Sequence, residues 1–299
     1  MKSAVWNEVH RNKVRLKYDS KKAHRKARVR RRGAKYQGKK IVHNCALRHE
    51  VDSRLMDDQS PQAISRRISN RHKDLPSISK NAIYRYIASI YGRRIEAHRL
   101  KRKRPWRPKR GSTKKLSQRT FIDKRPMYIN TRDRIGDVEA DFIVSGRSGK
   151  GILLTVVDRR SRASFIEQIL LVTIPNVHKA FFRIKQRFPE MKTMTTDNDL
   201  LFAQHKELET LLCIKIYFCH PYHSWEKGSI ENTNGVIRRD ILKGADISRY
   251  SKKFIMNLET KLNRRPMECI GDRTPQEVLE RYRKRVRENK KRRYHAGLR

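Results

Sequence analysis

The sequence predicts an α/β protein in which a mixed sheet with helices on its faces follows a small α-helical region. Two observations lead to this prediction. Residues 1–120 carry 37 Lys and Arg against 8 Asp and Glu, whereas residues 121–299 carry 37 against 22. Near Arg134 the hydrophobic period also changes from helical spacing to strand alternation. The chain therefore divides into a strongly basic helical part and a more balanced sheet-forming part.

The total charge restricts the class of partner. The 299 residues include 74 Lys and Arg but only 30 Asp and Glu, which gives a net charge of +44 at pH 7. Such a chain repels itself unless a polyanion neutralises it, so nucleic acid is the expected partner. Composition alone leaves open a DNA-acting enzyme, a DNA-binding protein without activity and a basic RNA-binding structural protein.

Nothing in the sequence predicts contact with a membrane. The longest apolar stretch, residues 151–158, is far below the roughly 18 residues that a membrane span needs. The Met1 end lacks the apolar core of a secretory signal. We therefore expect a cytoplasmic protein.

Residues 1–50 form a predicted basic arm or helix. From Arg11 to Lys40 basic residues dominate and apolar periodicity is almost absent. Such a segment is either a solvated helix or an arm that orders on a phosphate backbone. The charge favours contact with DNA.

Residues 51–92 carry the signals of two short helices. Ser60-Pro61 is an N-cap followed by proline at the first helical position, and an apolar stripe follows. Ser79 is the predicted cap of a second helix, on which Arg85 faces outward. A helix, a turn and a polar-faced helix are typical of a helix-turn-helix DNA-binding unit. A small helical packing module is the alternative.

Two further basic segments are predicted to follow phosphates. Residues 93–130 are interpreted as a linker that contains Pro105, Pro108 and Gly111. Its four consecutive cations, expected to contact DNA, are Lys101, Arg102, Lys103 and Arg104. Residues 281–299 close the chain as a basic tail, interpreted as a solvated helix end or an arm.

The sheet is predicted over residues 131–280. Alternation of apolar residues with Asp137, Glu139 and Asp141 predicts a first strand with an acidic face. Strands over 152–157 and 164–169, a helix over 177–188, a strand over 191–196, a helix over 201–212 and a strand over 214–219 complete the order βββαβαβ. This order favours a mixed five-stranded sheet, as in the ribonuclease-H-like fold, over an all-parallel sheet. Many other α/β domains share the same order.

Three carboxylates are candidates for a metal site. Asp141 lies in the middle of the first strand, Asp197 follows the fourth strand, and Glu231 lies on a later helix. Carboxylates brought together at one sheet edge repel one another unless a cation compensates them. Mg²⁺, for which Mn²⁺ is a possible substitute, binds carboxylates together with substrate phosphates. The alternative is three solvated surface acids.

Several neighbours of these acids are candidate DNA contacts. Arg238 shares a helix face with Glu231, and Lys227 precedes the same helix, so both are predicted to contact phosphate unless they only line a solvated face. Gly235 is expected to permit close approach of DNA. His220 is expected on a loop that touches DNA. Asp137 and Glu139 are either neighbours of the active site or ordinary strand-face charges.

The sequence resembles the DDE transposases of the insertion sequence 30 family over about residues 53–279. The most specific part is the Glu-Asn-Thr-Asn-Gly run that begins at Glu231. The matching motifs are Gly136-Asp137-Val138-Glu139-Ala140-Asp141, Thr196-Asp197-Asn198, Tyr217-Phe218-Cys219, Glu231-Asn232-Thr233-Asn234-Gly235, Leu262-Asn263-Arg264-Arg265-Pro266 and Thr274-Pro275-Gln276-Glu277-Val278.

This resemblance implies an integrase-type catalytic core in which Asp141, Asp197 and Glu231 match the family's metal-binding triad. The family's reaction is Mg²⁺-dependent strand cleavage and strand transfer at element ends, in which water and then a freed 3′-hydroxyl attack phosphodiesters. It also implies double-stranded DNA partners, namely terminal repeats and target DNA, and a homo-oligomer that joins two ends at the bacterial nucleoid.

The sequence departs from the family pattern at two positions in the core. Val138 stands where the family usually has Trp, and Asp199 stands where it usually has Gly. A glycine permits a positive φ, which aspartate adopts less readily, and Asp199 adds a negative charge near the predicted metal. Members also commonly begin with an additional helix-turn-helix. The alternative function is therefore a catalytically impaired or repurposed DNA-binding relic of a transposase.

Overall fold

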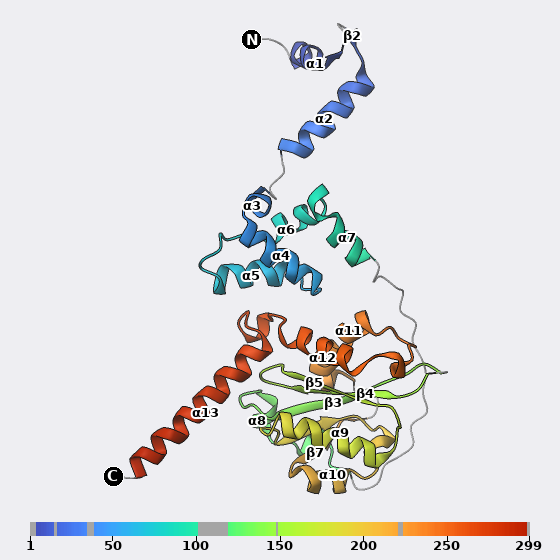
Figure 1. Cartoon of the computed structure of the whole chain (residues 1–299), viewed down its shortest axis with the longest axis vertical. Coiled ribbons are helices and arrows are strands. Elements are labelled where there is room, and N and C mark those ends of the chain that lie inside the picture. Colours follow the sequence, from blue (N-terminus) through green and yellow to red (C-terminus); the bar gives the residue numbers. More distant parts are fainter. Residues whose placement is uncertain are drawn as a thin grey trace. The chain divides into compact units, whose positions relative to one another are not determined.

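The computed structural model describes residues 4–14, 17–34, 39–100, 119–147, 149–220 and 224–297. The chain forms two compact units, Met1–Lys101 and Arg102–Arg299, drawn in Figure 1. The predicted cationic run from Lys101 to Arg104 lies outside the described residues. Each unit has its own hydrophobic core, so each is described by itself.

The first unit begins with a basic segment. It consists of α1 (Ala4–Asn12), the short paired strands β1 (Lys13–Val14) and β2 (Lys17–Tyr18), and α2 (Ser20–Ala34). Most described side chains of α2 are exposed, and Ala23 is buried. The segment from Ser20 to Ala34 is therefore helical, which is one of the two structures that its sequence predicts.

The predicted helix-turn-helix lies in a group of short helices around one core. These are α3 (Lys39–His43), α4 (Cys45–Met56), α5 (Pro61–Arg71), α6 (Lys80–Ile87), the 3₁₀ turn η1 (Ile90–Gly92) and α7 (Arg93–Leu100). Both predicted caps are present, because the hydroxyl groups of Ser60 and Ser79 each accept a hydrogen bond from a backbone N–H three residues later, at 3.2 Å. Arg85 is exposed on α6, as predicted.

Two sequence-based boundaries fall inside this group of helices. α4 runs through residue 50, and Leu47 and Val51 on either side of that position share one core. Ile95, in the segment predicted as a linker, is buried in the same core because α7 packs against α4 and α6. The linker prediction was wrong for residues 93–100, where one buried isoleucine among charged residues leaves almost no periodic signal.

The second unit contains the predicted mixed five-stranded sheet. Its strands are β3 (Asp137–Val144), β4 (Ile152–Asp158), β5 (Ser164–Ile169), β6 (Thr193–Thr196) and β7 (Lys215–Phe218). The order across the sheet is β5-β4-β3-β6-β7, with β3, β4 and β5 antiparallel and β3, β6 and β7 parallel. This is the ribonuclease-H-like arrangement, and it confirms the predicted fold class.

Helices cover both faces of this sheet. One face packs against α9 (Ile174–Arg187) and α10 (His205–Leu212), and the other packs against α11 (Gly228–Asp240) and α12 (Lys252–Asn263), as Figure 1 shows. Consecutive residues of β4 belong to different cores, Leu154 to the first and Leu153 to the second. The helix predicted over 201–212 is divided into the 3₁₀ turn η3 (Leu200–Phe202) and α10.

The other end of the predicted linker, residues 119–130, also belongs to a folded unit. The segment with η2 (Ile122–Lys124) and α8 (Met127–Asn130) packs beside β7, where the backbone N–H of Phe218 donates to the carbonyl of Thr120 at 2.8 Å. Ile129 is fully buried. The linker interpretation was therefore wrong for residues 119–130 as well.

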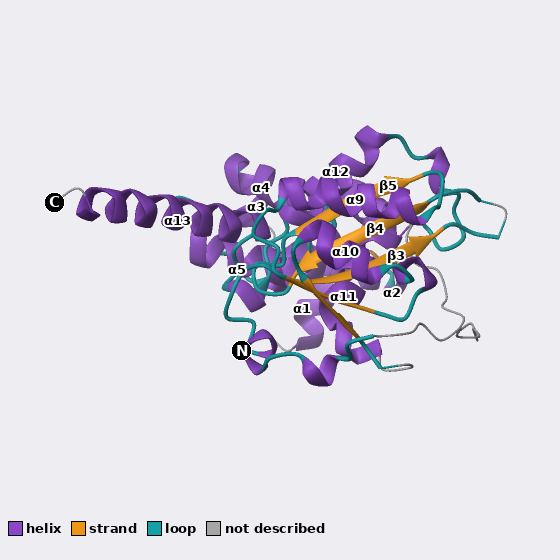
Figure 2. Cartoon of the chain, turned by 90° about the horizontal axis from the view of Figure 1, so that it is seen from below, coloured by secondary structure: helices purple, strands orange, loops and turns teal. Residues whose placement is uncertain are grey.

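The basic tail continues a long helix. α13 (Pro275–Gly297) begins with the predicted cap, because Thr274 and Glu277 exchange reciprocal hydrogen bonds at 3.0 and 3.2 Å. It runs through the predicted boundary at residue 280 and extends beyond the sheet in Figures 1 and 2. Across the part of the chain that the structure describes, no helix is both long and apolar enough to cross a membrane. The remaining 3₁₀ turns are η4 (Ser224–Lys227), η5 (Ile247–Arg249) and η6 (Glu268–Ile270).

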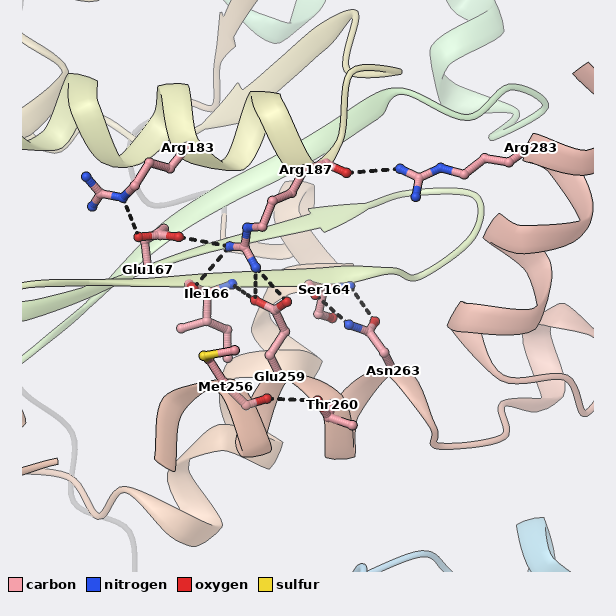
Figure 3. Close-up of polar contacts among 10 residues, drawn as sticks. All are labelled: Ser164, Ile166, Glu167, Arg183, Arg187, Met256, Glu259, Thr260, Asn263 and Arg283. Carbon is pink, nitrogen blue, oxygen red and sulfur yellow. Dashed lines mark hydrogen bonds and ion pairs between the residues drawn. The ribbon is translucent and has the colours of Figure 1, made fainter. Parts of the chain in front are cut away.

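Side chains from α12 and α9 form hydrogen bonds with the backbone of β5, the strand at one edge of the sheet (Figure 3). Asn263 accepts from the N–H of Ser164 at 2.8 Å and donates to its carbonyl at 2.7 Å. Glu259 accepts from the N–H of Ile166 at 2.6 Å, and Arg187 donates to the carbonyl of the same residue at 3.3 Å. The edge strand is thereby closed to pairing with another chain. The Asn-Arg-Arg-Pro motif thus contributes to architecture through its asparagine.

Replacement of Asn263 by Ala should destabilise the second unit. The change removes both partners of the Ser164 backbone, so we expect a loss of about 1–3 kcal/mol in the free energy of unfolding. Urea denaturation checks this value. Asn257→Ala, at an exposed position of the same helix, is the control and should change it by less than about 0.5 kcal/mol. Equal effects of the two substitutions would contradict the assignment.

Candidate active site

Two of the three predicted carboxylates lie side by side on two neighbouring parallel strands. Asp141 lies in β3, and Asp197 directly follows β6. In the pairing of these strands Glu139 lies opposite Thr195, so the same register continued by two residues brings Asp141 level with Asp197. Asp141 is half-buried, and the side chain of Asp197 is 44% exposed. The two acids therefore lie side by side, where the end of β6 meets the middle of β3.

The ammonium group of Lys227 lies between these carboxylates. Its Nζ is 3.3 Å from Oδ1 of Asp141 and 3.1 Å from Oδ2 of Asp197. Burial lowers the pKa of Lys227, but attraction to the two carboxylates prevails and raises it above the usual value. Burial also raises the pKa of Asp141, although Lys227 acts in the opposite direction. The two carboxylates thus share one cation, whose side chain is buried.

Asn234 on α11 orients the first aspartate. Its amide Nδ2 donates to Oδ2 of Asp141 at 2.7 Å, and its Oδ1 accepts from the hydroxyl of Thr155 at 3.0 Å. The Thr155 hydroxyl also lies 3.1 Å from the backbone carbonyl of Asp141. Both side-chain oxygens of Asp141 therefore have partners on the segment that carries Lys227 and Asn234.

Glu139 fixes the start of α11 to the sheet. Its Oε2 accepts from the N–H groups of Ser229 at 3.0 Å and Ile230 at 2.9 Å, which belong to the first turn of the helix. Its other oxygen lies 3.3 Å from Nε of Arg159, and both side chains are almost fully buried. Burial and the charge of Arg125 lower the pKa of Arg159 to about 10. Glu139 is therefore part of the support of the site.

Asp137 also has a structural role. Arg134 donates to both of its oxygens at 2.8 Å, and the hydroxyl of Thr193 donates to one of them at 2.6 Å. Since Asp137 and Glu139 are both buried, neither is an ordinary exposed charge on the strand face. They neighbour the candidate site and hold its surroundings together.

The third predicted ligand, Glu231, lies on the same helix but remains exposed. Glu231 is four residues after Lys227 and three before Asn234, so its side chain starts from the side of the helix that faces Asp141. Within residues 4–297, apart from the undescribed gaps, no group of three or more His, Cys, Asp or Glu is close enough to hold a metal ion. The structure brings two of the three acids together and places the third on the adjoining helical turn.

The predicted DNA contacts near this site have protein partners instead. The Lys227 side chain is 6% exposed and paired with the two aspartates, and its contact with phosphate stays a prediction. Arg238 is half-buried and donates to the carbonyls of Leu242 at 3.3 Å and Val144 at 3.4 Å. A Cβ at Gly235 would meet no atom within 4 Å, so the small residue is not required by a close approach within the chain.

Asp199 fits the backbone without strain. Its φ of −65° and ψ of 143° are those of extended chain, and its side chain accepts from the N–H of Leu201 at 2.9 Å. The expected conflict with a positive φ was therefore wrong, because the residue caps η3 rather than forming a left-handed turn. Burial raises the pKa of Asp199.

His220 follows β7 and contacts the segment that precedes β3. Its ring nitrogens lie 3.0 Å from Glu226 and 2.8 Å from Asp123, and its ring stacks on Phe121 with centroids 5.4 Å apart. The hydrogen bond that the ring donates to Glu226 raises the pKa of His220 above the usual value, burial acts against it, and Asp123 adds to the rise. His220 therefore joins protein segments, and its expected contact with DNA remains a prediction.

The donor set suits a hard divalent cation. Asp141 and Asp197 direct carboxylate oxygens at one cationic position, and Mg²⁺ and Mn²⁺ prefer such oxygens. The side chain of Asp197 is 44% exposed, so the position is accessible from solvent. The arrangement therefore fits the metal that the sequence predicts.

Asn234 is the functional residue that sequence reasoning missed. Helical spacing from Glu231 identified Gly235 and Arg238, although position i+3 on the same face is equally close. An asparagine between two candidate site residues was the available signal. Arg159, which holds Glu139, follows directly after β4 and carried no signal of its own.

Known proteins are similar to this chain over most of its length. The chain is 37% identical over 284 residues to the transposase for insertion sequence element IS4351 of Bacteroides fragilis, a match that covers 92% of this chain and 85% of that protein. It is 31% identical over 297 residues to transposase InsI for insertion sequence element IS30A of Escherichia coli K12, covering 93% and 76%.

A solved structure and the family models add two findings. The catalytic core domain of BIV integrase matches 50% of this chain and 98% of that chain, with 20% sequence identity and a TM-score of 0.40. No family model matches the sequence.

The two transposases identify the class of protein as a DDE-type polynucleotidyl transferase, and the ribonuclease-H-like sheet agrees with that class. The extent of the identity with the two transposases shows the family directly. The chain belongs to the IS30 family of insertion sequence transposases, and its activity is DNA transposition.

Replacement of Glu139 by Ala should loosen the start of α11, because it removes the oxygen that accepts from the first amides of the helix. The substitution leaves the Arg159 guanidinium buried without its counter-ion, so we expect a loss of about 3–5 kcal/mol in the free energy of unfolding. Hydrogen exchange should also speed up at the amides of Ser229 and Ile230. The exposed Glu280→Gln on α13 is the control and should change neither quantity. Unchanged exchange at the two amides would contradict the proposed role.

The contacts of His220 predict a pH-dependent stability. Because its pKa is raised in the folded state, the stabilisation is complete below the unfolded value of about 6.5 and disappears as the pH rises through the raised pKa. Thermal melting of the wild type and His220→Gln, compared from about pH 5.5 to about pH 9, measures this effect. The difference in melting temperature should be largest at the acidic end. A difference that stays constant over the range would rule out the linkage.

Proposed function

We propose that the chain binds the ends of an insertion sequence and joins them to target DNA, with Asp141, Asp197 and Glu231 as its metal-binding carboxylates. The observation that supports the proposal is the convergence of Asp141 and Asp197 on one cationic position. The metal is Mg²⁺, for which Mn²⁺ substitutes. Glu231 completes the set from the first turn of α11, whose position Glu139 fixes.

The proposed reaction consists of two phosphoryl transfers. Water cleaves a phosphodiester at the element end, and the 3′-hydroxyl released then attacks a phosphodiester of the target, so the number of phosphodiester bonds is conserved in the second step. When bound, the metal activates the attacking oxygen and stabilises the leaving oxygen. Asn234 holds Asp141 in orientation through its amide. No covalent bond between protein and DNA is required.

DNA contacts are proposed on both units. Arg85, exposed on the second helix of the helix-turn-helix, is placed to reach a DNA groove. The run Lys101 to Arg104 is proposed to bind phosphates. Arg238 and Lys227 remain candidates only if DNA or metal releases them from their present partners.

The assembly and location follow from the same reaction. Transposition joins two element ends, so we propose that a homo-oligomer holds them together on double-stranded DNA. Relatives of the chain occur in bacteria such as Bacteroides fragilis and Escherichia coli. We accordingly place the activity in the cytoplasm, at the nucleoid.

The triad is tested by a strand-transfer assay with labelled terminal-repeat DNA in Mg²⁺, Mn²⁺ or EDTA. Asp141→Asn, Asp197→Asn and Glu231→Gln should each lower strand transfer by roughly a thousandfold, since each removes a metal ligand. DNA binding, measured by mobility shift, should remain nearly unchanged because none of the three contacts phosphate. EDTA should abolish the activity of the wild type.

Asp133→Asn is the matched control, since its carboxylate is 73% exposed and lies outside the site. It should keep full activity. Retained strand transfer in one of the three variants would remove that residue from the triad. Tight binding by the wild type without cleavage in either metal would instead identify a non-catalytic DNA-binding protein.

A further inference from the structure

Lys227 occupies the position at which a metal would meet the two aspartates. Its ammonium lies 3.3 Å from Asp141 and 3.1 Å from Asp197, on carboxylates that come from different strands. The remaining oxygen of Asp141 accepts from the Asn234 amide at 2.7 Å. One lysine therefore makes the contacts that would otherwise require a cation from solution.

We propose that Lys227 is a positioning residue that holds Asp141 and Asp197 together in the metal-free enzyme and leaves them when the divalent cation binds. The inference rests on the proposed function, which assigns the metal to the same two carboxylates. It goes beyond that function because it makes metal binding an exchange of one cation for another. Metal affinity then depends on a residue that is not itself a ligand.

The electrostatics require a cation at this position. Two carboxylates this close repel each other, and a cation between them offsets that repulsion. Lys227 offsets part of it, while Asp199, whose carboxylate interacts with both Asp197 and Lys227, adds a further negative charge nearby. A divalent ion in place of the ammonium neutralises both carboxylates completely. The single positive charge of Lys227 is thus enough to hold the two carboxylates together. The double charge of the metal ion is attracted more strongly and can displace it.

The local backbone allows the lysine to leave. Lys227 is the residue before α11, with φ −117° and ψ 39°, so its side chain starts from a turn outside the helix. A lysine presents its charge on a flexible four-carbon stem, which can turn away without movement of the backbone. Glu139 meanwhile keeps the first turn of α11 in place through Ser229 and Ile230. Release of Lys227 therefore does not require the helix to move.

Lys227 and the divalent cation therefore compete for the same two carboxylates, and this competition can be measured without catalysis. In Lys227→Met the carboxylates lose their cation, so the melting temperature in EDTA should fall by several degrees. The same change removes the competitor, so the dissociation constant for Mn²⁺, measured by calorimetry without DNA, should fall by about tenfold. Lys227→Arg keeps the charge and should retain most of the stability in EDTA.

Lys261→Met is the matched control because its Nζ pairs with Asp240 at 3.3 Å, away from the two aspartates. It should lower the melting temperature and leave the dissociation constant for Mn²⁺ unchanged. If Lys227→Met binds Mn²⁺ no more tightly than the wild type, the inference is overturned. The same conclusion follows if it melts in EDTA at the temperature of the wild type.

Asp197→Asn separates failure of the inference from failure of the proposed function. Loss of Mn²⁺ binding in this variant supports the metal site, and the behaviour of Lys227→Met then decides the inference alone. Equal Mn²⁺ binding by the wild type and Asp197→Asn would overturn the metal site and, with it, the exchange of cations.

Discussion

The candidate site depends on the buried carboxylate of Glu139. It lies on β3 two residues before Asp141 and accepts hydrogen bonds from the first amides of α11. β3 therefore carries one acid of the site itself and positions the helix of Glu231 and Asn234 through a single side chain. A buried carboxylate is costly alone, but the positive end of a helix and the Arg159 guanidinium compensate it.

Much of the fold could be predicted because periodicity reports burial. Apolar alternation identified β3, and serine and threonine caps identified the starts of α5, α6 and α13. Periodicity does not report which element a face packs against, so the sequence predicted a mixed sheet but not the order of strands across it. It also fails where one apolar residue suffices, which is why α7 and α8 were assigned to a linker.

The site was predicted less completely, for a physical reason. The converging positions of Asp141 and Asp197 follow from strand order, whereas the partner of a charged side chain does not follow from its own sequence neighbourhood. Lys227 is 86 residues from Asp141, and its charge is as compatible with phosphate as with a carboxylate. At Asp199 the family pattern suggested strain, but the side chain provides a cap that glycine lacks.

The distribution of these contacts along the chain determines when the site can exist. β3 is synthesised before α11 supplies the partners of Glu139 and before α12 closes the edge of β5. A nascent chain that ends after β6 therefore has a sheet whose edge at β5 is open, and it lacks Glu231. A chain that ends before Lys227 therefore lacks both side-chain partners of the Asp141 carboxylate.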